Sequence, residues 1–156
     1  MSNQPFPDKA GVVMFPPLLY VLFIALGLSA SYFFPYPILP PMVRLLGWLF
    51  VALGLVVVVS AVVQLNKHHT TVNPSGVTTA IVQKGIFQYS RNPMYVSFTL
   101  TYLGIMLLNN AWLGFLLLIP LLLIVQKGII EREENYLTRK FGEEYLQYKS
   151  AIRRWF

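Results

Sequence analysis

Apolar residues fill four long segments of the chain, and polar residues gather between and after them. The segments cover about residues 12–34, 42–64, 93–108 and 111–130. A helix needs about 20 apolar residues to cross the hydrocarbon core of a bilayer. The pattern therefore predicts an all-α fold, an integral membrane helical bundle of about four transmembrane helices. The third segment is short, because its roughly 16 residues reach only about 24 Å, so we expect the last two segments to form a tight hairpin.

Beyond the fourth segment, the apolar positions change to the spacing of an amphipathic helix. They are separated by three, four or seven residues and comprise Ile130, Leu137, Phe141, Tyr145, Tyr148, Ile152 and Trp155. Such spacing places the side chains on one face of a helix. We therefore predict a C-terminal amphipathic helix on the cytoplasmic surface, held there by aromatic anchors. Gly142 can divide this helix into two shorter ones.

The chain is expected to form a single membrane domain over residues 1–156. Residues 1–64 form a nearly charge-free transmembrane hairpin, and residues 70–156 carry most of the polar groups. Between these halves a loop is predicted at residues 70–75, because Asn-Pro followed by glycine favours a turn. Pro120 removes a backbone hydrogen bond inside the fourth segment and should bend that helix. The N-terminal segment is not expected to be a cleaved signal, since its apolar run is longer than a signal core.

Composition supports the membrane assignment and excludes several kinds of site. The 156 residues are 56% hydrophobic and 12% charged, with a mean hydropathy of +0.59, values too apolar for an ordinary soluble domain. The net charge of +6 comes from basic residues that flank apolar segments, so anionic lipid headgroups explain it better than a nucleic-acid partner. Cysteine is absent, which excludes disulfides and thiolate catalysis. No metal site is expected, because the adjacent His68 and His69 point apart and no further histidine completes a set.

The basic residues also orient the chain, since Lys and Arg near the ends of spans stay on the cytoplasmic side. All of the 12 Lys and Arg residues except Arg44 lie before the first segment, between the second and third, or at and beyond the end of the fourth. We therefore expect a multi-pass protein of the cytoplasmic (inner) membrane with both termini cytoplasmic. The Pro-rich link at residues 35–41 and the turn at Asn109 and Asn110 should lie outside.

A polar group stands at the start of the third segment, where Arg91 is followed by Asn92 and Pro93. Asn92 has a side chain suited to capping a helix, and Pro93 suits the first turn, where its missing N–H costs nothing. A helix should therefore begin here and run into the membrane. Arg91 lies beside free backbone donors and the positive end of the helix dipole. Together these groups predict a seat for a carboxylate or phosphate.

Acidic residues concentrate after the fourth segment, and their positions around the tail helix differ. At about 100° per residue, Glu134 lies about 20° from the centre of the apolar stripe, whereas Glu133 lies about 80° away. A carboxylate in apolar surroundings needs a partner. That partner is either an arginine of the cytoplasmic loop or a cationic ligand, and we favour the ligand because both regions meet the same membrane face. Glu134 should therefore matter more for ligand binding than Glu143, which we expect in water.

Five tyrosines are expected to line this membrane face: Tyr89, Tyr95, Tyr136, Tyr145 and Tyr148. Aromatic rings attract a sulfonium or ammonium group through cation–π interaction. Interfacial tyrosines are common in membrane proteins, so they support a cationic ligand only together with the charged residues.

Two motifs resemble a known superfamily of membrane enzymes. The first, GIFQYSRNPMY, is similar to a glycine, an aromatic residue and Arg-His-Pro-x-Tyr, with Asn92 in place of the common histidine. The second has an acidic pair followed by Leu, Phe-Gly, two tyrosines and a terminal Arg. Over about residues 81–155 the chain thus resembles the isoprenylcysteine carboxyl methyltransferase and phospholipid methyltransferase superfamily. The matching residues are Gly85, Phe87, Tyr89, Arg91, Pro93 and Tyr95, then Glu133, Glu134, Leu137, Phe141, Gly142, Tyr145, Tyr148 and Arg154.

The resemblance implies S-adenosyl-L-methionine as the cofactor and residues 70–156 as the cofactor-binding catalytic half. Arg91, Glu134 and Arg154 would form the catalytic set. Arg91 would hold the cofactor's carboxylate, Glu133 or Glu134 its ammonium, the tyrosines its sulfonium, and the backbone of residues 83–87 its adenosine. Asn92 can donate a hydrogen bond but cannot act as an imidazole. The full set implied for cofactor binding is Gln83, Lys84, Gly85, Phe87, Tyr89, Arg91, Asn92, Pro93, Tyr95, Glu133 and Glu134.

The implied reaction is methyl transfer to a lipid-like or lipid-attached acceptor: a prenylcysteine-type carboxylate, a phospholipid amine or a small apolar molecule. Displacement at a sulfonium needs alignment and water exclusion more than acid–base groups. Two alternatives stand beside it. A sterol-type, NADPH-dependent membrane reductase has a related Arg-x-Pro-Asn-Tyr motif, but Met94 takes the place of that asparagine. A non-catalytic membrane scaffold would use Arg91 and Glu134 only as an ion pair across the bundle.

We predict that reporter fusions after Asn110 and after Phe156 report opposite sides of the membrane, because the basic residues place the first outside and the second in the cytoplasm. Alkaline phosphatase activity and green fluorescent protein fluorescence measure the two sides. Finding both fusion points on one side would contradict the topology.

Overall fold

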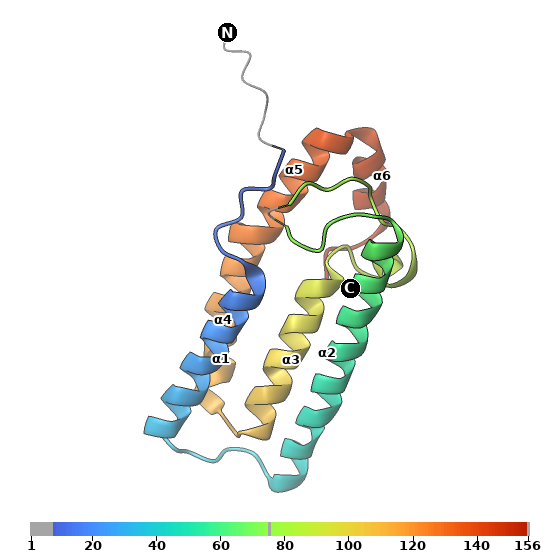
Figure 1. Cartoon of the computed structure of the whole chain (residues 1–156). Coiled ribbons are helices and arrows are strands. Elements are labelled where there is room, and N and C mark those ends of the chain that lie inside the picture. Colours follow the sequence, from blue (N-terminus) through green and yellow to red (C-terminus); the bar gives the residue numbers. More distant parts are fainter. Residues whose placement is uncertain (1–7, 75, 156) are drawn as a thin grey trace.

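The computed structural model describes residues 8–74 and 76–155, and this part of the chain is helical and contains no strand (Figure 1). The prediction of an all-α fold is therefore confirmed. Residues 1–7, within the predicted N-terminal half, and residue 75 of the predicted loop lie outside the described residues. The helices are α1 (Pro16–Phe33), α2 (Pro41–Lys67), the 3-10 turn Gly85–Gln88, α3 (Pro93–Leu108), α4 (Trp112–Val125), the π-helical turn Gln126–Ile130, α5 (Glu131–Phe141) and α6 (Glu143–Ala151).

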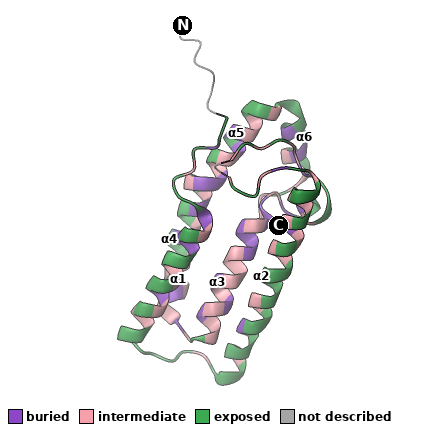
Figure 2. Cartoon of the chain, in the orientation of Figure 1, coloured by how far each residue is buried: buried purple, intermediate pink, exposed green. Residues whose placement is uncertain are grey.

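Three helical stretches in the described residues are long and apolar enough to cross a membrane: α1, α2 and the continuous stretch Trp112–Phe141. The apolar helix α3 has only 16 residues, so its crossing of the bilayer stays a prediction. Prolines set the starts of α1, α2 and α3, because a proline lacks the N–H that the first turn leaves unbonded. Much of the outer surface of α1 and α2 is exposed and apolar (Figure 2), as contact with lipid tails requires.

The C-terminal tail forms two helices, α5 and α6, rather than one long surface helix. α5 continues directly from the π-helical turn that ends α4, and α6 begins only after Gly142. Gly142 has a φ of +55°, a left-handed conformation that glycine adopts at little cost. In Figure 1, α6 turns back from α5 towards the bundle. The division at Gly142 therefore brings α6 to the start of α3. Pro120 lies inside α4, which continues past it to Val125.

Close contact between α2 and α3 depends on small residues. Gly47 and Gly104 face each other, and a Cβ added to Gly104 would stand 2.7 Å from the Gly47 carbonyl oxygen. Further along the same pair of helices, Gly54 meets Thr101, where an added Cβ would be 2.4 Å from Oγ1. Small residues at such positions allow two membrane helices to approach closely. This packing holds the start of α3, with Arg91 before it, beside the end of α2.

The other helices form the larger part of the core. α1 packs on α4, where the Cα of Gly114 would lie 3.0 Å from a Cβ added to Gly27. The fully buried Tyr102 of α3 donates its hydroxyl proton to the Gly114 carbonyl oxygen at 2.7 Å. Met106 fills the space between these helices and has no exposed surface. The core therefore lies where α3 meets the pair α1 and α4.

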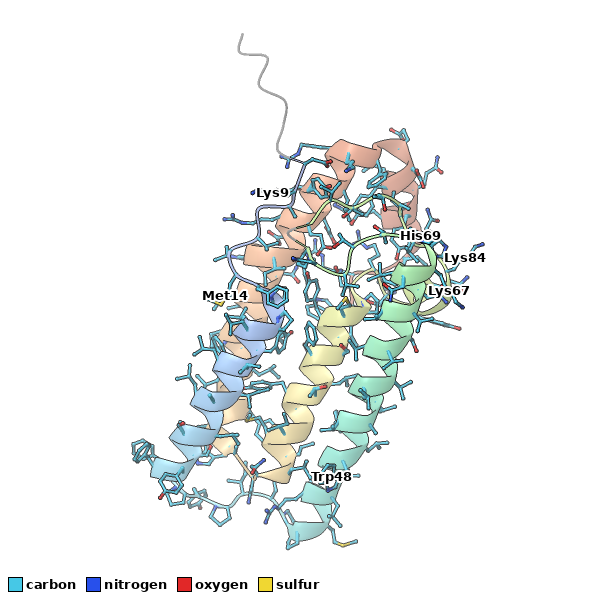
Figure 3. The ribbon with its side chains drawn as sticks, viewed as in Figure 1. Lys9, Met14, Trp48, Lys67, His69 and Lys84 are labelled. Carbon is cyan, nitrogen blue, oxygen red and sulfur yellow. The ribbon has the colours of Figure 1, made fainter. Side chains whose placement is uncertain are left out.

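Polar elements gather at one end of the bundle. α5, α6, residues 8–15 and the loop between α2 and α3 lie there (Figure 1). Lys9, Lys67 and Lys84 also lie at this end, whereas Trp48 lies towards the other (Figure 3). Residues 8–15 are tied to the last helices: the Val13 N–H donates to the Gly128 carbonyl oxygen at 3.2 Å. The concentration of basic residues at one end is the arrangement that the positive-inside rule requires.

We expect Gly104→Ala to lower the thermal unfolding temperature in detergent, because the new methyl group meets the Gly47 backbone, which cannot rotate away. Overpacking of this kind costs about 1–3 kcal/mol. Ala52→Leu is the matched control, since it adds more volume at an exposed position of α2. Equal unfolding temperatures for Gly104→Ala and the parent would contradict the close helix contact.

Candidate functional site

A cavity of about 330 Å³ lies at the polar end of the bundle. Its walls come from the start of α1, the end of α2, residues 70–74, 78 and 80–82 of the following loop, the start of α3, and helices α5 and α6. A largely apolar pocket with a few convergent polar groups is typical of a small-molecule site, and such sites usually have about 300–1,000 Å³. The apolar lining includes Phe15, Leu65, Val82, Phe87, Phe98 and Leu137, and the polar lining includes Arg91, Asn92, Tyr95, Glu133, Glu134, Tyr145 and Tyr148.

The start of α3 places Arg91 at this wall. Pro93 is the first helical residue and Asn92 the N-cap residue, as predicted. The predicted capping bond is wrong, however, because the Asn92 side chain makes no cap bond and its Nδ2 donates to the Arg154 carbonyl oxygen at 3.1 Å. The N–H of Asn92 donates instead to the Ser90 hydroxyl at 3.1 Å. A contact with the C-terminal tail thus replaces the local cap.

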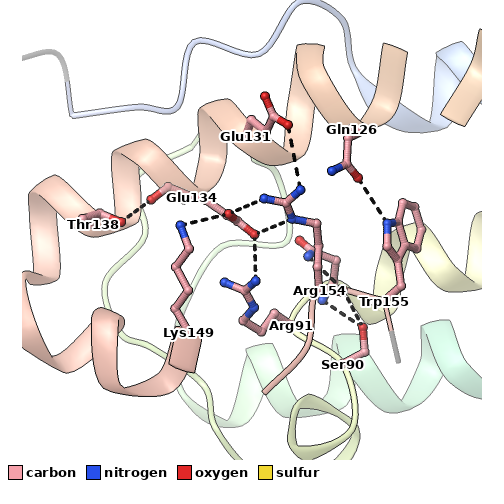
Figure 4. A network of polar contacts seen from close by, with 10 residues as sticks. Ser90, Arg91, Gln126, Glu131, Glu134, Thr138, Lys149, Arg154 and Trp155 are labelled. Carbon is pink, nitrogen blue, oxygen red and sulfur yellow. Dashed lines mark hydrogen bonds and ion pairs between the residues drawn. The ribbon is translucent and has the colours of Figure 1, made fainter. Parts of the chain in front are cut away.

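Glu134 is buried, with 3% of its surface exposed, and three basic residues surround its carboxylate (Figure 4). Arg154 binds it with both ends of its guanidinium, at 2.9 Å from Nε to Oε1 and 2.8 Å from Nη2 to Oε2. Nη2 of Arg91 lies 3.3 Å from Oε1, and Nζ of Lys149 lies 3.3 Å from Oε2. The burial predicted for Glu134 is therefore confirmed. Of the two partners left open for Glu134, the arginine of the loop is present, because Arg91 contacts one carboxylate oxygen and Arg154 and Lys149 contact the other.

Arg91 keeps part of its guanidinium unbonded. Its side chain is only 8% exposed, and Nε and Nη1 are buried without a hydrogen-bond partner in the described residues. A buried donor without a partner costs about 1–3 kcal/mol, and more when the group is charged. Arg91 also lines the cavity. An anion placed there would satisfy the two nitrogens.

Glu133 presents the opposite charge to the same cavity. The hydroxyl of Tyr95 donates to its Oε2 at 2.9 Å, and no basic side chain of the described residues forms an ion pair with it. Glu133 therefore differs from Glu134, although the two are neighbours in the sequence. The cavity therefore holds two guanidinium nitrogens without hydrogen-bond partners and a carboxylate without an ion-pair partner in the described residues, a combination that suits a ligand with both charges.

Two tyrosines of α6, Tyr145 and Tyr148, also line the cavity. The hydroxyl of Tyr148 donates to the carbonyl oxygen of Phe87 at 2.8 Å, and its ring centroid lies 6.2 Å from that of Tyr145. Burial raises the pKa of both tyrosines above the usual value of a phenol, and the Glu134 carboxylate raises the pKa of Tyr145 further. Both rings therefore stay neutral at physiological pH and can face a cation with their π-electrons.

Residues 152–155, which we call the C-terminal strap, bind the segment that carries Arg91. The Arg91 N–H donates to the carbonyl oxygen of Arg153 at 3.0 Å, and the Ser90 hydroxyl donates to that of Arg154 at 3.1 Å. Trp155 fixes the end of the strap, since its Nε1 donates to Oε1 of Gln126 in the π-helical turn at 3.2 Å (Figure 4). The strap therefore joins the start of α3 to the junction of α4 and α5.

The sequence is similar to a known protein family and to two known proteins. The pattern of the family described as phospholipid methyltransferase matches residues 42–144. The chain belongs to this family. An uncharacterized protein of Haemophilus influenzae is 46% identical over 65 residues, 40% of this chain and 98% of that protein. The protein-S-isoprenylcysteine O-methyltransferase of Schizosaccharomyces pombe is 31% identical over 105 residues, 66% of this chain but only 44% of that enzyme. No solved structure matches the chain.

In this member of the membrane methyltransferase family, the structure brings most of the predicted site residues together at the cavity. Among the residues predicted to bind a cofactor, Phe87, Arg91, Asn92, Pro93, Tyr95, Glu133 and Glu134 line the cavity. The others do not: Gln83, Lys84, Gly85 and Tyr89 are exposed and outside the lining. Arg154 also lies outside the lining, although its guanidinium contacts the lining residue Glu134 and its carbonyl oxygen accepts from the lining residue Asn92.

Sequence reasoning missed two parts of this family member's site. Residues 15–17 line the cavity before α1, and their only sequence signal is the pair of prolines that starts the helix. The contacts of the C-terminal strap were missed as well, because backbone carbonyl acceptors have no sequence signal. Tyr136 was predicted to line the site, but its hydroxyl donates to Oδ1 of Asp8 at 2.8 Å and it is outside the cavity lining.

We expect Tyr148→Phe to lower the stability of the folded protein by about 1–3 kcal/mol, because the buried Phe87 carbonyl loses its donor. Tyr89→Phe is the matched control, since Tyr89 is 69% exposed. Thermal unfolding in detergent, followed by tryptophan fluorescence, measures both. A larger effect of Tyr89→Phe than of Tyr148→Phe would contradict the placement of α6 against the 3-10 turn.

Proposed function

We propose that this chain is an integral membrane methyltransferase that uses S-adenosyl-L-methionine and acts on a lipid-like or lipid-attached acceptor. One observation carries the proposal: two donors of Arg91, Nε and Nη1, that lack hydrogen-bond partners and the carboxylate of Glu133, which has no ion-pair partner in the described residues, lie in one cavity. An amino-acid group, with its carboxylate and ammonium, satisfies both at once. Leaving either charge buried and unpaired is unfavourable. Family membership supports the same class of reaction.

The cofactor's groups can be assigned to residues of the cavity. Arg91 binds the carboxylate, and Glu133, held by the Tyr95 hydroxyl, binds the ammonium. Glu133 takes this role rather than Glu134, because Glu134 has no oxygen free of a protein cation. The rings of Tyr145 and Tyr148 line the cavity, and we assign the positive sulfonium to them because aromatic rings attract a cation.

The cofactor supplies an electrophilic methyl group on a sulfonium. Its transfer to a nucleophile is a direct displacement, so the chain contributes alignment and exclusion of water. Arg91 and Glu133 fix one end of the cofactor, which limits its rotation. The bond from Tyr148 to the Phe87 carbonyl joins two residues of the cavity wall, and residues 15–17, 70–74 and 80–82 supply other parts of it.

The acceptor side of the cavity is apolar. Phe15, Pro16 and Pro17 at the start of α1 and Phe98 of α3 line it, and none of them offers a charged group. A lipid tail can lie against these residues while the nucleophile reaches the methyl group at the cytoplasmic boundary of the membrane. The proposed topology has four crossings, with both termini in the cytoplasm of an inner membrane. The chain spans less than half of the matching yeast enzyme, so the acceptor is proposed only as a class.

The scaffold alternative explains one contact and leaves two unexplained. It requires an ion pair between Arg91 and Glu134, which lie 3.3 Å apart. It gives no reason for the two unpartnered nitrogens of Arg91 or for the unpaired carboxylate of Glu133. The reductase alternative is weakened because Met94, which replaces the asparagine of the reductase motif, lines the cavity.

We predict that Glu133→Gln weakens the binding of S-adenosyl-L-methionine by about tenfold to a hundredfold. A buried hydrogen bond to a charged group contributes about 1.5–3 kcal/mol, and each 1.4 kcal/mol corresponds to about a factor of ten in affinity. Isothermal titration calorimetry in nanodiscs measures the affinity, and thermal unfolding checks the fold. Transfer of a radiolabelled methyl group into a lipid extract of the expression host tests the reaction itself.

Glu143→Gln is the matched control for this experiment. Glu143 is exposed, and an exposed charge contributes little, so its loss should leave the affinity unchanged. No binding of S-adenosyl-L-methionine by the folded parent protein would refute the proposed function. Equal affinities of the parent and Glu133→Gln would remove Glu133 from the site.

A further inference from the structure

Arg154 contacts a residue of the cavity wall without lining the cavity itself. It lies outside the cavity lining, yet it donates two hydrogen bonds to Glu134, at 2.9 Å and 2.8 Å. A bidentate bond between an arginine and a carboxylate is stronger and more precisely oriented than a single ion pair. Of the three cations at Glu134, Arg154 is therefore the one that contacts both carboxylate oxygens.

The orientation of Glu134 affects Arg91, because the two side chains are also paired. Only Nη2 of Arg91 approaches Glu134, at 3.3 Å from Oε1. Nε and Nη1 remain without partners in the described part of the chain. A carboxylate with both oxygens free would bind a guanidinium through two parallel hydrogen bonds and would occupy one of those nitrogens. Oε2 of Glu134 already contacts Arg154 and Lys149, and an oxygen has two lone pairs, so this second contact does not form.

Hydrogen bonds to backbone carbonyl oxygens of the C-terminal strap hold Arg91 and Arg154 next to the same carboxylate. The Arg91 N–H donates to the Arg153 carbonyl oxygen at 3.0 Å, and the side chains of Ser90 and Asn92 both donate to that of Arg154 at 3.1 Å. The C-terminal strap is thus attached to the same three residues whose central member is Arg91. Arg91 and Arg154 are held on the two sides of one carboxylate.

We propose that Arg154 is a positioning residue: by holding both oxygens of Glu134, it keeps two donors of Arg91 open for the carboxylate of the cofactor. The inference rests on the proposed function, in which Arg91 binds that carboxylate. It assigns no contact with the cofactor to Arg154 or to Glu134. In an Arg154 variant, Glu134 is free to pair with Arg91 and to close the anion seat.

Two ligands that differ in one group separate this role from a general structural one. S-adenosylhomocysteine carries the carboxylate that Arg91 is proposed to bind. Its decarboxylated analogue, 5′-(3-aminopropylthio)-5′-deoxyadenosine, has the same adenosine and ammonium but lacks the carboxylate. Calorimetry of the full chain in nanodiscs gives both affinities. Arg154→Gln should weaken S-adenosylhomocysteine about tenfold and leave the affinity for the analogue within about twofold, and Arg154→Lys should show the same selectivity with a smaller loss.

The double variant Arg154→Gln with Glu134→Gln tests whether the lost affinity for S-adenosylhomocysteine can be restored. A neutral glutamine side chain at position 134 cannot neutralise Arg91, so the double variant should regain most of the affinity for S-adenosylhomocysteine that Arg154→Gln loses. Arg153→Gln is the matched control, because this neighbouring arginine is exposed and should change neither affinity. Thermal unfolding identifies any variant that is not folded, in which case Arg154→Lys carries the comparison.

The outcomes distinguish the inference from the function on which it rests. A parent protein that binds neither ligand would overturn both. A parent that binds S-adenosylhomocysteine, with Arg154 variants that lose the two ligands equally, would overturn the positioning role and leave the proposed function intact. A double variant that stays as weak as Arg154→Gln would overturn it as well. Selective loss followed by recovery is the expected result.

Discussion

One buried carboxylate constrains the whole polar end of the molecule. Glu134 is 3% exposed and sits on a helix that continues from an apolar span, where an unpaired charge is very unfavourable. Three basic side chains from three different segments neutralise it: Arg91 before α3, Lys149 of α6 and Arg154 of the C-terminal strap. The packing of these segments therefore has to satisfy Glu134 before a ligand enters. Breaking the arrangement at one partner leaves the others with an unmatched charge.

The packing of the helices brings the three basic partners of Glu134 close to its carboxylate. Glycines let α2 and α3 approach closely, which fixes the start of α3, while α1 and α4 form the second pair and carry α5 beyond the apolar core. The positive φ of Gly142 then turns α6 back towards Arg91. The cavity between these elements is mostly apolar with a few charged groups, so each of its charges acts in surroundings of low dielectric constant and has a strong effect.

Much of the fold could be predicted from local sequence, and the site only in part. Long apolar segments and the prolines that begin them specify the helices, because both act within one helix. The helical spacing of the tail correctly predicted that Glu134 is buried. It placed Glu133 well away from the apolar stripe of the tail helix, although Glu133 also lines the cavity. Those angular positions assume that residues 130–155 form one continuous helix. Since Gly142 separates α5 from α6, positions beyond it carry no information about the faces of α5.

The role of Asn92 shows why the remaining contacts were beyond the sequence. Its amide was expected to cap α3, a local bond that is common at such positions, yet it donates to a carbonyl oxygen 62 residues away. That acceptor belongs to the backbone, so no residue type marks it. The contact needs a hydrogen-bond donor and no base, and a neutral imidazole also has one donor nitrogen. The Asn92 amide supplies this donor, and it therefore helps to hold the C-terminal strap and with it the position of Arg154.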